Sequence, residues 1–127
     1  MPESRYQEAA DLRSALRRFL RRSEEVARRH QLTPRQYLLL LMTKASEDGR
    51  PTTITDLVER LALTQSTVTE LVQRAEEAGL IARTPSPSDG RVTHLSLTPV
   101  GSQRFEAAFA ELGPEREELL GTFRSGV

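Results

Sequence analysis

Residues 54–83 read ITDLVERLALTQSTVTELVQRAEEAGLIAR and contain two amphipathic helical patterns separated by a short break. In each pattern, apolar residues recur at i, i+3, i+4 and i+7, the spacing of one buried helix face. Thr53 and Thr64 each precede a pattern, and threonine is a preferred residue for capping a helix N-terminus. Because only Ala62 and Leu63 separate the two helices, the sequence predicts a helix-turn-helix motif. The expected buried faces are Ile54, Leu57, Val58 and Leu61, then Val68, Leu71, Val72 and Ala75.

Helical patterns also precede this motif. Residues 4–29 form a long arginine-rich pattern, which is expected to be one helix. Thr33, Pro34 and Gln36 then make a capping box with proline at the first helical position, where its missing N–H costs nothing. The helix that follows is expected to end at Gly49. The apolar faces predicted for these two helices are Leu12, Leu16, Phe19 and Val26, then Leu38, Leu41, Met42 and Ala45.

Downstream of the motif the apolar period changes from that of a helix to that of a strand. Residues 80–84 are short and apolar, residues 91–97 alternate, and the loop PSPSDG lies between them. A loop that ends in Asp and Gly between two such runs is typical of a β-hairpin. Two more helices are expected, one capped by Thr98 and one starting at Pro114. The sequence therefore predicts a mainly α fold with a small β-hairpin.

The composition is that of an ordinary soluble domain. The 127 residues suffice for one compact domain, and 37% are hydrophobic and 28% charged. The absence of cysteine excludes disulfides, thiolate metal sites and thiol redox sensing. No apolar run has the length of a membrane span, and the first residues lack the apolar stretch of a secretory signal. We therefore expect a cytoplasmic protein without a membrane partner.

Charge is unevenly distributed along a chain whose net charge is zero. Residues 1–50 carry eleven Arg and Lys against seven Asp and Glu, and residues 51–127 carry seven against eleven. A nucleic-acid interface in this chain must therefore be a local patch, because the whole-protein field cannot supply it.

The second helix of the motif presents small, hydrogen-bonding side chains to solvent. Glutamine can bond adenine, hydroxyls can reach bases or phosphates, and glutamate can accept from cytosine N4. The helix N-terminus also offers free N–H groups to a phosphate. An ordinary solvated face has a similar composition, but the hairpin that follows directly favours DNA recognition. The candidate residues are Thr64, Gln65, Ser66, Thr67, Thr69, Glu70, Gln73 and Arg74.

The tip of the predicted hairpin is a second candidate contact, formed by Ser88, Asp89, Gly90 and Arg91. An arginine on a protruding hairpin is well placed for a narrow minor groove, where its charge is favoured. Asp89 can hold Arg91 in one orientation by pairing with it. The alternative is an ordinary surface turn with an incidental ion pair, which contributes little stability.

Residues 89–98, DGRVTHLSLT, resemble the wing signature of the MarR family of bacterial regulators, Asp-x-Arg, three residues, then Leu-x-Leu-Thr. The resemblance continues in LTPRQYLLL (32–40), in residues 54–83 quoted above and in TPVG (98–101). It covers about residues 32–112 and presents the capping box, the reader helix and the wing in the family's order. Three departures are Glu70, where many relatives have a basic residue, Gly90, where the wing is frequently basic, and the segment after Pro114, which is short for the family's last helix.

The resemblance implies a single MarR-like domain over residues 1–127, with a winged helix-turn-helix lobe at about 33–98. It implies dimerisation helices at about 4–30 and 99–124, and a homodimer that binds double-stranded DNA. The reader helix would enter the major groove and Arg91 the flanking minor groove, on a near-palindrome with half-sites about 10 base pairs apart.

The resemblance also implies a repressor that a small aromatic or phenolic effector releases from DNA. The family's pocket lies between the dimer helices and the DNA-binding lobe. Phe19, Tyr37 and Phe105 are the candidate lining residues, although aromatics at helical spacing are more often part of the core.

Two other functional classes compete with DNA binding. A winged-helix protein-interaction module is favoured by the acidic second half and by Glu70, and is opposed by Arg74 and Arg91. An enzyme is disfavoured because the chain has no nucleophile elbow or glycine-rich phosphate loop. No metal or cofactor is expected, since His30 and His94 stand far apart without supporting carboxylates. His30 is instead expected at the end of the first helix and His94 on the hairpin.

Overall fold

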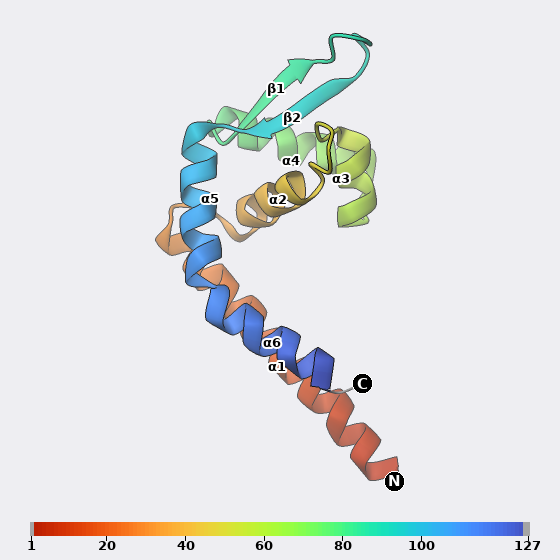
Figure 1. The fold of residues 1–127 in the computed structure, drawn as a ribbon, viewed down its shortest axis with the longest axis vertical. Coiled ribbons are helices and arrows are strands. Elements are labelled where there is room, and N and C mark those ends of the chain that lie inside the picture. The colour runs from red at the N-terminus through yellow and green to blue at the C-terminus, as the bar shows by residue number, and fades with distance from the viewer. Residues whose placement is uncertain (1, 126–127) are drawn as a thin grey trace.

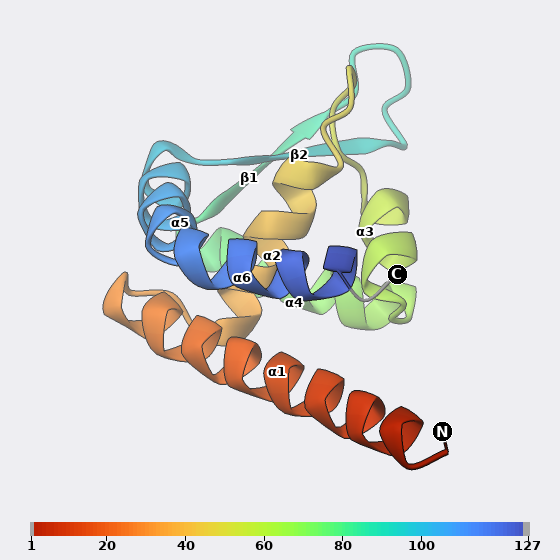
Figure 2. The ribbon, with the colours of Figure 1, turned by 60° about the horizontal axis from the view of Figure 1, so that its bottom comes forward.

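The computed structural model describes residues 2–125, which form a lobe of short elements and a pair of helices that protrude from it. In Figure 1 the hairpin, α2, α3 and α4 make the lobe, and α5 connects it to α6, which runs beside α1. Figure 2 shows α6 in front of α2 and α4, with α1, which contacts α6, running along the lower edge. The elements are α1 (Pro2–Arg29), α2 (Pro34–Ala45), α3 (Ile54–Leu61), α4 (Gln65–Glu77), β1 (Ile81–Pro85), β2 (Thr93–Leu97), α5 (Pro99–Glu111) and α6 (Gly113–Ser125).

The predicted capping box at the start of α2 and the predicted threonine cap of α3 are confirmed. Thr33 Oγ1 accepts from Gln36 N at 3.1 Å, and Gln36 Oε1 accepts from Thr33 N at 2.9 Å. Thr53 and Asp56 make the same reciprocal pair at the start of α3, at 3.3 and 2.8 Å. These bonds satisfy backbone N–H groups that a helix cannot satisfy itself, which is why the sequence alone located both helix starts.

The predicted hairpin is also confirmed, with β1 antiparallel to β2 in a register that pairs Ile81 with Leu97 and Pro85 with Thr93. An isolated bridge joins Leu95 to Thr52, where Leu95 N donates to Thr52 O at 2.8 Å. The Thr52 hydroxyl in turn donates to Thr43 O at 2.7 Å. This chain of bonds ties the hairpin to the end of α2, and nothing in the sequence pattern indicated it.

The predicted buried face of α2 is wrong. Leu38 is 42% exposed, Ala45 is exposed, and Leu41 and Met42 are only half-buried. The helix contacts α1, α3, α4, α5 and β2, so it is enclosed on several sides. Because residues 38–41 are all leucine, apolar side chains surround one whole turn, and periodicity could not choose the inner face. The buried residues are Tyr37, Leu39, Leu40 and Thr43.

Arg50 strengthens the start of α3 by a bidentate contact with Asp56. The Nη2–Oδ1 distance is 2.6 Å and the Nη1–Oδ2 distance is 2.9 Å. The hydrogen bonds from Arg50 and from the cap at Thr53 lower the pKa of Asp56 from 3.8 to about 2. Because this pKa is lower in the folded chain than in the unfolded one, the carboxylate stabilises the fold fully above about pH 4. That stabilisation is lost as the pH falls through about 2.

Arg50→Ala is therefore expected to lower the free energy of unfolding at pH 7, since it removes one ion pair at a helix cap. The difference in the free energy of unfolding between the variant and the wild type should become smaller as the pH falls below about 4. Asp56 loses its charge in the unfolded chain first, because its pKa is lower in the folded chain. Urea denaturation from pH 7 to pH 3 measures this difference. A difference that stays constant over this range would contradict the assigned role of the carboxylate.

Candidate nucleic-acid interface

The turn between α3 and α4 fixes how the second helix leaves the first. Ala62 adopts a left-handed backbone with φ of 53°, and its N–H donates to Val58 O at 3.0 Å. Thr64 then caps α4, accepting from Thr67 N at 3.2 Å and donating to Thr67 Oγ1 at 2.8 Å. The Thr64 and Thr67 hydroxyls are thus used in holding the helix start, which leaves the neighbouring side chains to face outward.

One face of α4 is core and the opposite face is solvent-exposed. Val68, Val72 and Ala75 are buried, as expected from their spacing. Thr69 is half-buried, and no hydrogen bond within the described residues holds the amides of Gln65 or Gln73. The exposed residues of the candidate surface are Thr64, Gln65, Ser66, Glu70, Gln73 and Arg74.

Glu70 and Arg74 form an ion pair that the sequence analysis did not foresee. Arg74 Nη2 lies 2.6 Å from Glu70 Oε1, one turn apart on the exposed face. Arg74 is also the only basic residue within α4. An exposed pair at this spacing contributes about 0.3–0.5 kcal/mol, so a stronger partner can separate it. The i, i+4 spacing of opposite charges was the signal that could have predicted the pair.

The wing is an ordered loop that displays its arginine. Ser86 N donates to Val92 O at 2.8 Å, and Val92 N donates to Asp89 O at 3.0 Å. Asp89 Oδ1 accepts from Arg91 N at 3.0 Å and from Arg91 Nε at 3.4 Å, so the expected pairing is present. The Arg91 side chain is nevertheless 93% exposed. Of the other candidates, Ser88 and Gly90 are exposed and Asp89 is half-buried.

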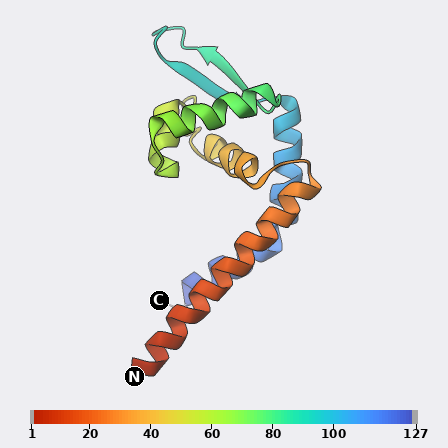
Figure 3. The ribbon, with the colours of Figure 1, turned by 180° about the vertical axis from the view of Figure 1, so that it is seen from behind.

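The wing loop and the first turn of α4 lie at the same end of the lobe. Figure 3 shows α4 running beneath the hairpin, with its N-terminal end and the tip of the hairpin on the same side, and Figure 1 shows the same arrangement from the front. The two sets of candidate residues, which are separated in sequence, therefore belong to one end of the molecule.

The three aromatic candidates do not share one cavity. Phe19 and Tyr37 line a mainly apolar cavity of about 500 Å³ together with Phe109 and Arg116. Phe105 is 3% exposed and lies behind this cavity, with its ring centroid 5.5 Å from that of Tyr37. The Arg116 guanidinium stacks 3.7 Å above the Phe109 ring, and burial raises the pKa of Tyr37.

His30 lies directly after α1, where it was expected. Its Nε2 is 2.8 Å from Glu111 Oε1, and Arg29 contacts the other oxygen of that carboxylate. The hydrogen bond from His30 is the main cause that lowers the pKa of Glu111. His94 lies on β2, as expected, opposite Thr84.

Among the described residues, His, Cys, Asp and Glu do not gather in groups that could hold a metal ion. None of the helices described is both long and apolar enough to cross a membrane.

Comparison with known proteins places this arrangement in a family. A sequence model of the MarR family matches residues 30–92, which include both capping boxes, the helix-turn-helix, β1 and the wing loop. The transcriptional repressor IacR of Pseudomonas putida is 37% identical over 73 residues, which are 58% of this chain and 41% of IacR. The matched part of the chain spans less than half the length of the curated repressors with which it shares 35–37% identity.

Solved structures show the same fold. A mutant of MarR from E. coli complexed with operator DNA has a TM-score of 0.71 at 20% identity, covering 87% of this chain and 78% of that one. BpsR of Bordetella bronchiseptica, whose DNA binding is regulated by 6-hydroxynicotinic acid, has a TM-score of 0.61 at 26% identity, covering 91% and 78%. With its confirmed hairpin and helix-turn-helix, this chain belongs to the MarR family of winged helix-turn-helix regulators.

Proposed function

We propose that this chain binds double-stranded DNA sequence-specifically and represses transcription. The observation that carries the proposal is the position of a polar, hydrogen-bonding first turn of α4 beside an ordered wing whose Arg91 is 93% exposed. A helix of this kind fits the major groove, and an exposed arginine at the same end of the lobe fits the flanking minor groove. The repressor name of IacR and the operator complex of MarR support the same function.

The candidate residues divide into those that read bases and those that position the protein. Gln65, Ser66 and Gln73 are exposed on α4 and present amide or hydroxyl groups to base edges or phosphates. Arg74 is assigned to a backbone phosphate, which requires it to leave Glu70, and Glu70 then accepts from cytosine N4 or disfavours other bases. Thr64, Thr67 and Thr69 support the helix start and its polar face, and Ser88, Asp89 and Gly90 present Arg91.

Gln65→Ala is expected to change the base preferred at one position of each half-site, because a bidentate glutamine contact discriminates by about 1–3 kcal/mol. The overall affinity should fall by a smaller factor than the discrimination between bases at that position, since the phosphate contacts remain. Selection of bound sequences from a randomised duplex pool measures the change. Arg28→Ala, an exposed arginine on α1, is the control, and a preference profile that stays unchanged in Gln65→Ala would remove its base-reading role.

We propose that the chain forms a homodimer and that α1 and α6 make the interface with the second subunit. Both helices protrude from the lobe, and they expose apolar side chains that include Leu20 at 60% and Phe123 at 46%. A second copy would bury these side chains in a two-fold symmetric interface. A dimer with two-fold symmetry would bind a near-palindromic operator whose half-sites are about 10 base pairs apart.

We assign the aromatic-lined cavity to a small aromatic or phenolic effector. Its walls include Phe19, Tyr37, Leu41 and Phe109, and Arg116 lies at its edge. Its volume of about 500 Å³ is in the range of small-molecule sites. The cavity touches α1, α2, α5 and α6, so an occupant would act where the protruding helices meet the lobe. The regulation of BpsR by 6-hydroxynicotinic acid is consistent with such a ligand.

Fluorescence anisotropy of a labelled duplex from upstream of the gene, with a scrambled duplex as control, tests the DNA-binding function. We expect specific binding with a dissociation constant of about 10⁻⁸ M, and the affinity should decrease as the salt concentration rises. Equal binding to both duplexes would contradict sequence specificity for that region. Absence of binding at low salt by a folded dimer would favour a protein-interaction module, for which the acidic second half of the chain and Glu70 are the supporting features.

A further inference from the structure

Most cations of the lobe are held in ion pairs within the lobe itself. Residues 33–98 carry seven Arg and Lys against eight Asp and Glu, so the lobe has a net charge of −1. Among these residues, all of which the structure describes, five of the seven cations contact a carboxylate. The five pairs are Lys44 with Glu47, Arg50 with Asp56, Arg74 with Glu70, Arg83 with Glu76, and Arg91 with Asp89. Because non-specific DNA binding is electrostatic, such a surface attracts DNA of arbitrary sequence only weakly.

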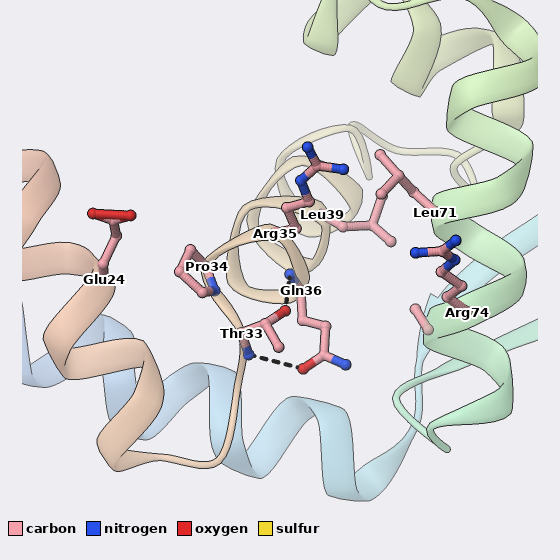
Figure 4. Close-up of a pocket in the computed structure, with 9 residues that line it drawn as sticks. Glu24, Thr33, Pro34, Arg35, Gln36, Leu39, Leu71 and Arg74 are labelled. Atoms are coloured by element: carbon pink, nitrogen blue, oxygen red, sulfur yellow. Dashed lines mark hydrogen bonds between the residues drawn. The ribbon is translucent and has the colours of Figure 1, made fainter.

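The two remaining cations of the lobe lie on α2 and α3. Arg60 donates to Ser46 Oγ at 3.0 Å and to Ala45 O at 3.3 Å, so it serves the C-terminal end of α2. Arg35 lies in the first turn of α2, and together with Arg74 it lines a groove of about 560 Å³ between α2 and α4 (Figure 4). Among residues 65–77, which form α4 and which we call the recognition helix, Arg74 is the only cation.

The recognition helix is acidic. It contains three glutamates beside its one arginine, which gives it a net charge of −2. Arg74 Nη2 lies 2.6 Å from Glu70 Oε1, and the two side chains are 70% and 61% exposed. Glu70 shares its helix face with Ser66 and Gln73, since three or four residues separate it from each. The carboxylate therefore lies on the face proposed to meet the bases, in a contact that is weak enough to be exchanged.

We propose that Glu70 determines the specificity of the recognition helix: it withholds Arg74 from the phosphates of arbitrary DNA and releases it at a cytosine. Cytosine presents its N4 amino group in the major groove, and this donor can replace the guanidinium at the Glu70 carboxylate. Guanine and thymine present acceptors there, which repel a carboxylate, so the ion pair stays closed. Adenine ranks second, because its N6 amino group is also a donor. This inference rests on the proposed DNA-binding function.

Specificity of this kind arises because wrong sites are penalised as well as because the right site is favoured. On arbitrary DNA, the recognition helix brings a carboxylate toward the phosphates and gains no phosphate contact from Arg74. On the operator, Glu70 accepts a hydrogen bond from a base and Arg74 makes a charge-assisted bond to a phosphate. The affinities for the two kinds of DNA therefore differ by more than either contact alone would give.

Binding of a scrambled duplex at low salt, followed by fluorescence anisotropy, tests whether Glu70 withholds Arg74. Glu70→Gln is expected to raise the affinity for this duplex by about tenfold, because it frees a guanidinium for a charge-assisted phosphate contact. The slope of log affinity against log salt should become steeper by about one unit for each arginine freed. Glu77→Gln is the matched control, because it removes the same charge from an exposed position of α4 that forms no ion pair among the described residues. It should leave both quantities near those of the wild type.

Arg74→Gln separates withholding from direct repulsion of phosphates by Glu70. Alone, it should change the affinity for the scrambled duplex little, because the wild-type Arg74 does not contact that duplex. Combined with Glu70→Gln, it should abolish the tenfold gain, since the two residues act through one contact. A gain of the same size in the double variant would show that Glu70 acts by repulsion alone and would overturn the proposal. A Glu70→Gln variant that binds the scrambled duplex no better than Glu77→Gln would overturn it too.

Selection of bound sequences from a randomised duplex pool tests the release at cytosine. The wild type should prefer cytosine at one position of each half-site, and Glu70→Gln should shift that preference to adenine, because glutamine bonds adenine N6 and N7. A profile that keeps cytosine in Glu70→Gln would exclude Glu70 as its reader. Absence of any base preference in the wild type would overturn the release at cytosine together with the proposed function. The scrambled duplex would still decide whether Glu70 withholds Arg74, because that measurement needs no operator.

Discussion

Arg91→Ala is expected to weaken binding of the dimer to its operator by about 100-fold, because each of two wings loses one charge-assisted contact of about 1.4 kcal/mol. The side chain is 93% exposed, and among the described residues its hydrogen-bond and ion-pair partner is Asp89 alone, so its removal changes little else in the fold. The slope of log affinity against log salt should decrease by about one unit for each arginine removed. Anisotropy titrations with the operator duplex over a salt series measure both quantities.

Arg91→Lys is the matched variant for this prediction. It retains the charge, so the salt slope should stay near that of the wild type, while the affinity falls because lysine lacks the planar guanidinium. Asp89→Asn should have an intermediate effect, since it removes the carboxylate that holds Arg91 at Nε but keeps an oxygen for Arg91 N. An Arg91→Ala variant with the wild-type affinity and slope would exclude the wing arginine from the interface.

Gly101→Ala is expected to lower the free energy of unfolding by about 3 kcal/mol or more, among the larger effects of a single substitution. A Cβ atom at this buried position would lie 2.2 Å from Leu80 O, 3.0 Å from Leu80 C and 3.1 Å from Leu80 Cα. These are all backbone atoms at the start of the hairpin, so no side-chain rotation relieves the overlap. The first turn of α5 has to move away from the lobe.

That movement would break the bonds that join α5 to the end of α4. Thr98 N donates to Leu80 O at 3.0 Å, and the Thr98 hydroxyl donates to Gly79 O at 2.6 Å. Urea denaturation of Gly101→Ala measures the loss of stability. Gly90→Ala is the control, because beyond its two chain neighbours no described residue has an atom within 4 Å of its Cβ position, and its free energy of unfolding should stay within about 0.5 kcal/mol of the wild type. Equal stability of the two variants would show that α5 is not held closely against Leu80.

The elements that the sequence located share a local cause. Thr33 and Thr53 predict helix starts because the capping bonds join residues three apart. The Asp-Gly turn predicts the hairpin because it connects two strands that are adjacent in the sequence. The same holds for the exposed face of α4, since a helix with one apolar stripe has only one face left for solvent. The candidate DNA-contacting residues of α4 follow from this local pattern alone, and their role in binding stays a proposal.

Features that join distant segments were out of reach of the sequence. The bridge of Thr52 to Leu95 and the contact of His30 with Glu111 link residues that no local pattern relates. Phe105 was grouped with Phe19 and Tyr37, yet packing places it behind the cavity and Phe109 on its wall. Which aromatic lines a cavity depends on how α5 lies against α2, and spacing within one helix does not contain that information.

Local sequence determined the helix starts, the hairpin and the polar face of α4, because hydrogen bonds over three or four residues and the period of apolar positions act within a single element. Tertiary packing decided which side of α2 is buried, where the cavities lie and that Arg35 and Arg74 line one groove. A helix that carries leucines around a whole turn has no preferred buried face until the neighbouring elements pack against it. The burial of apolar surface does not depend on direction, so the whole fold is needed to make that choice.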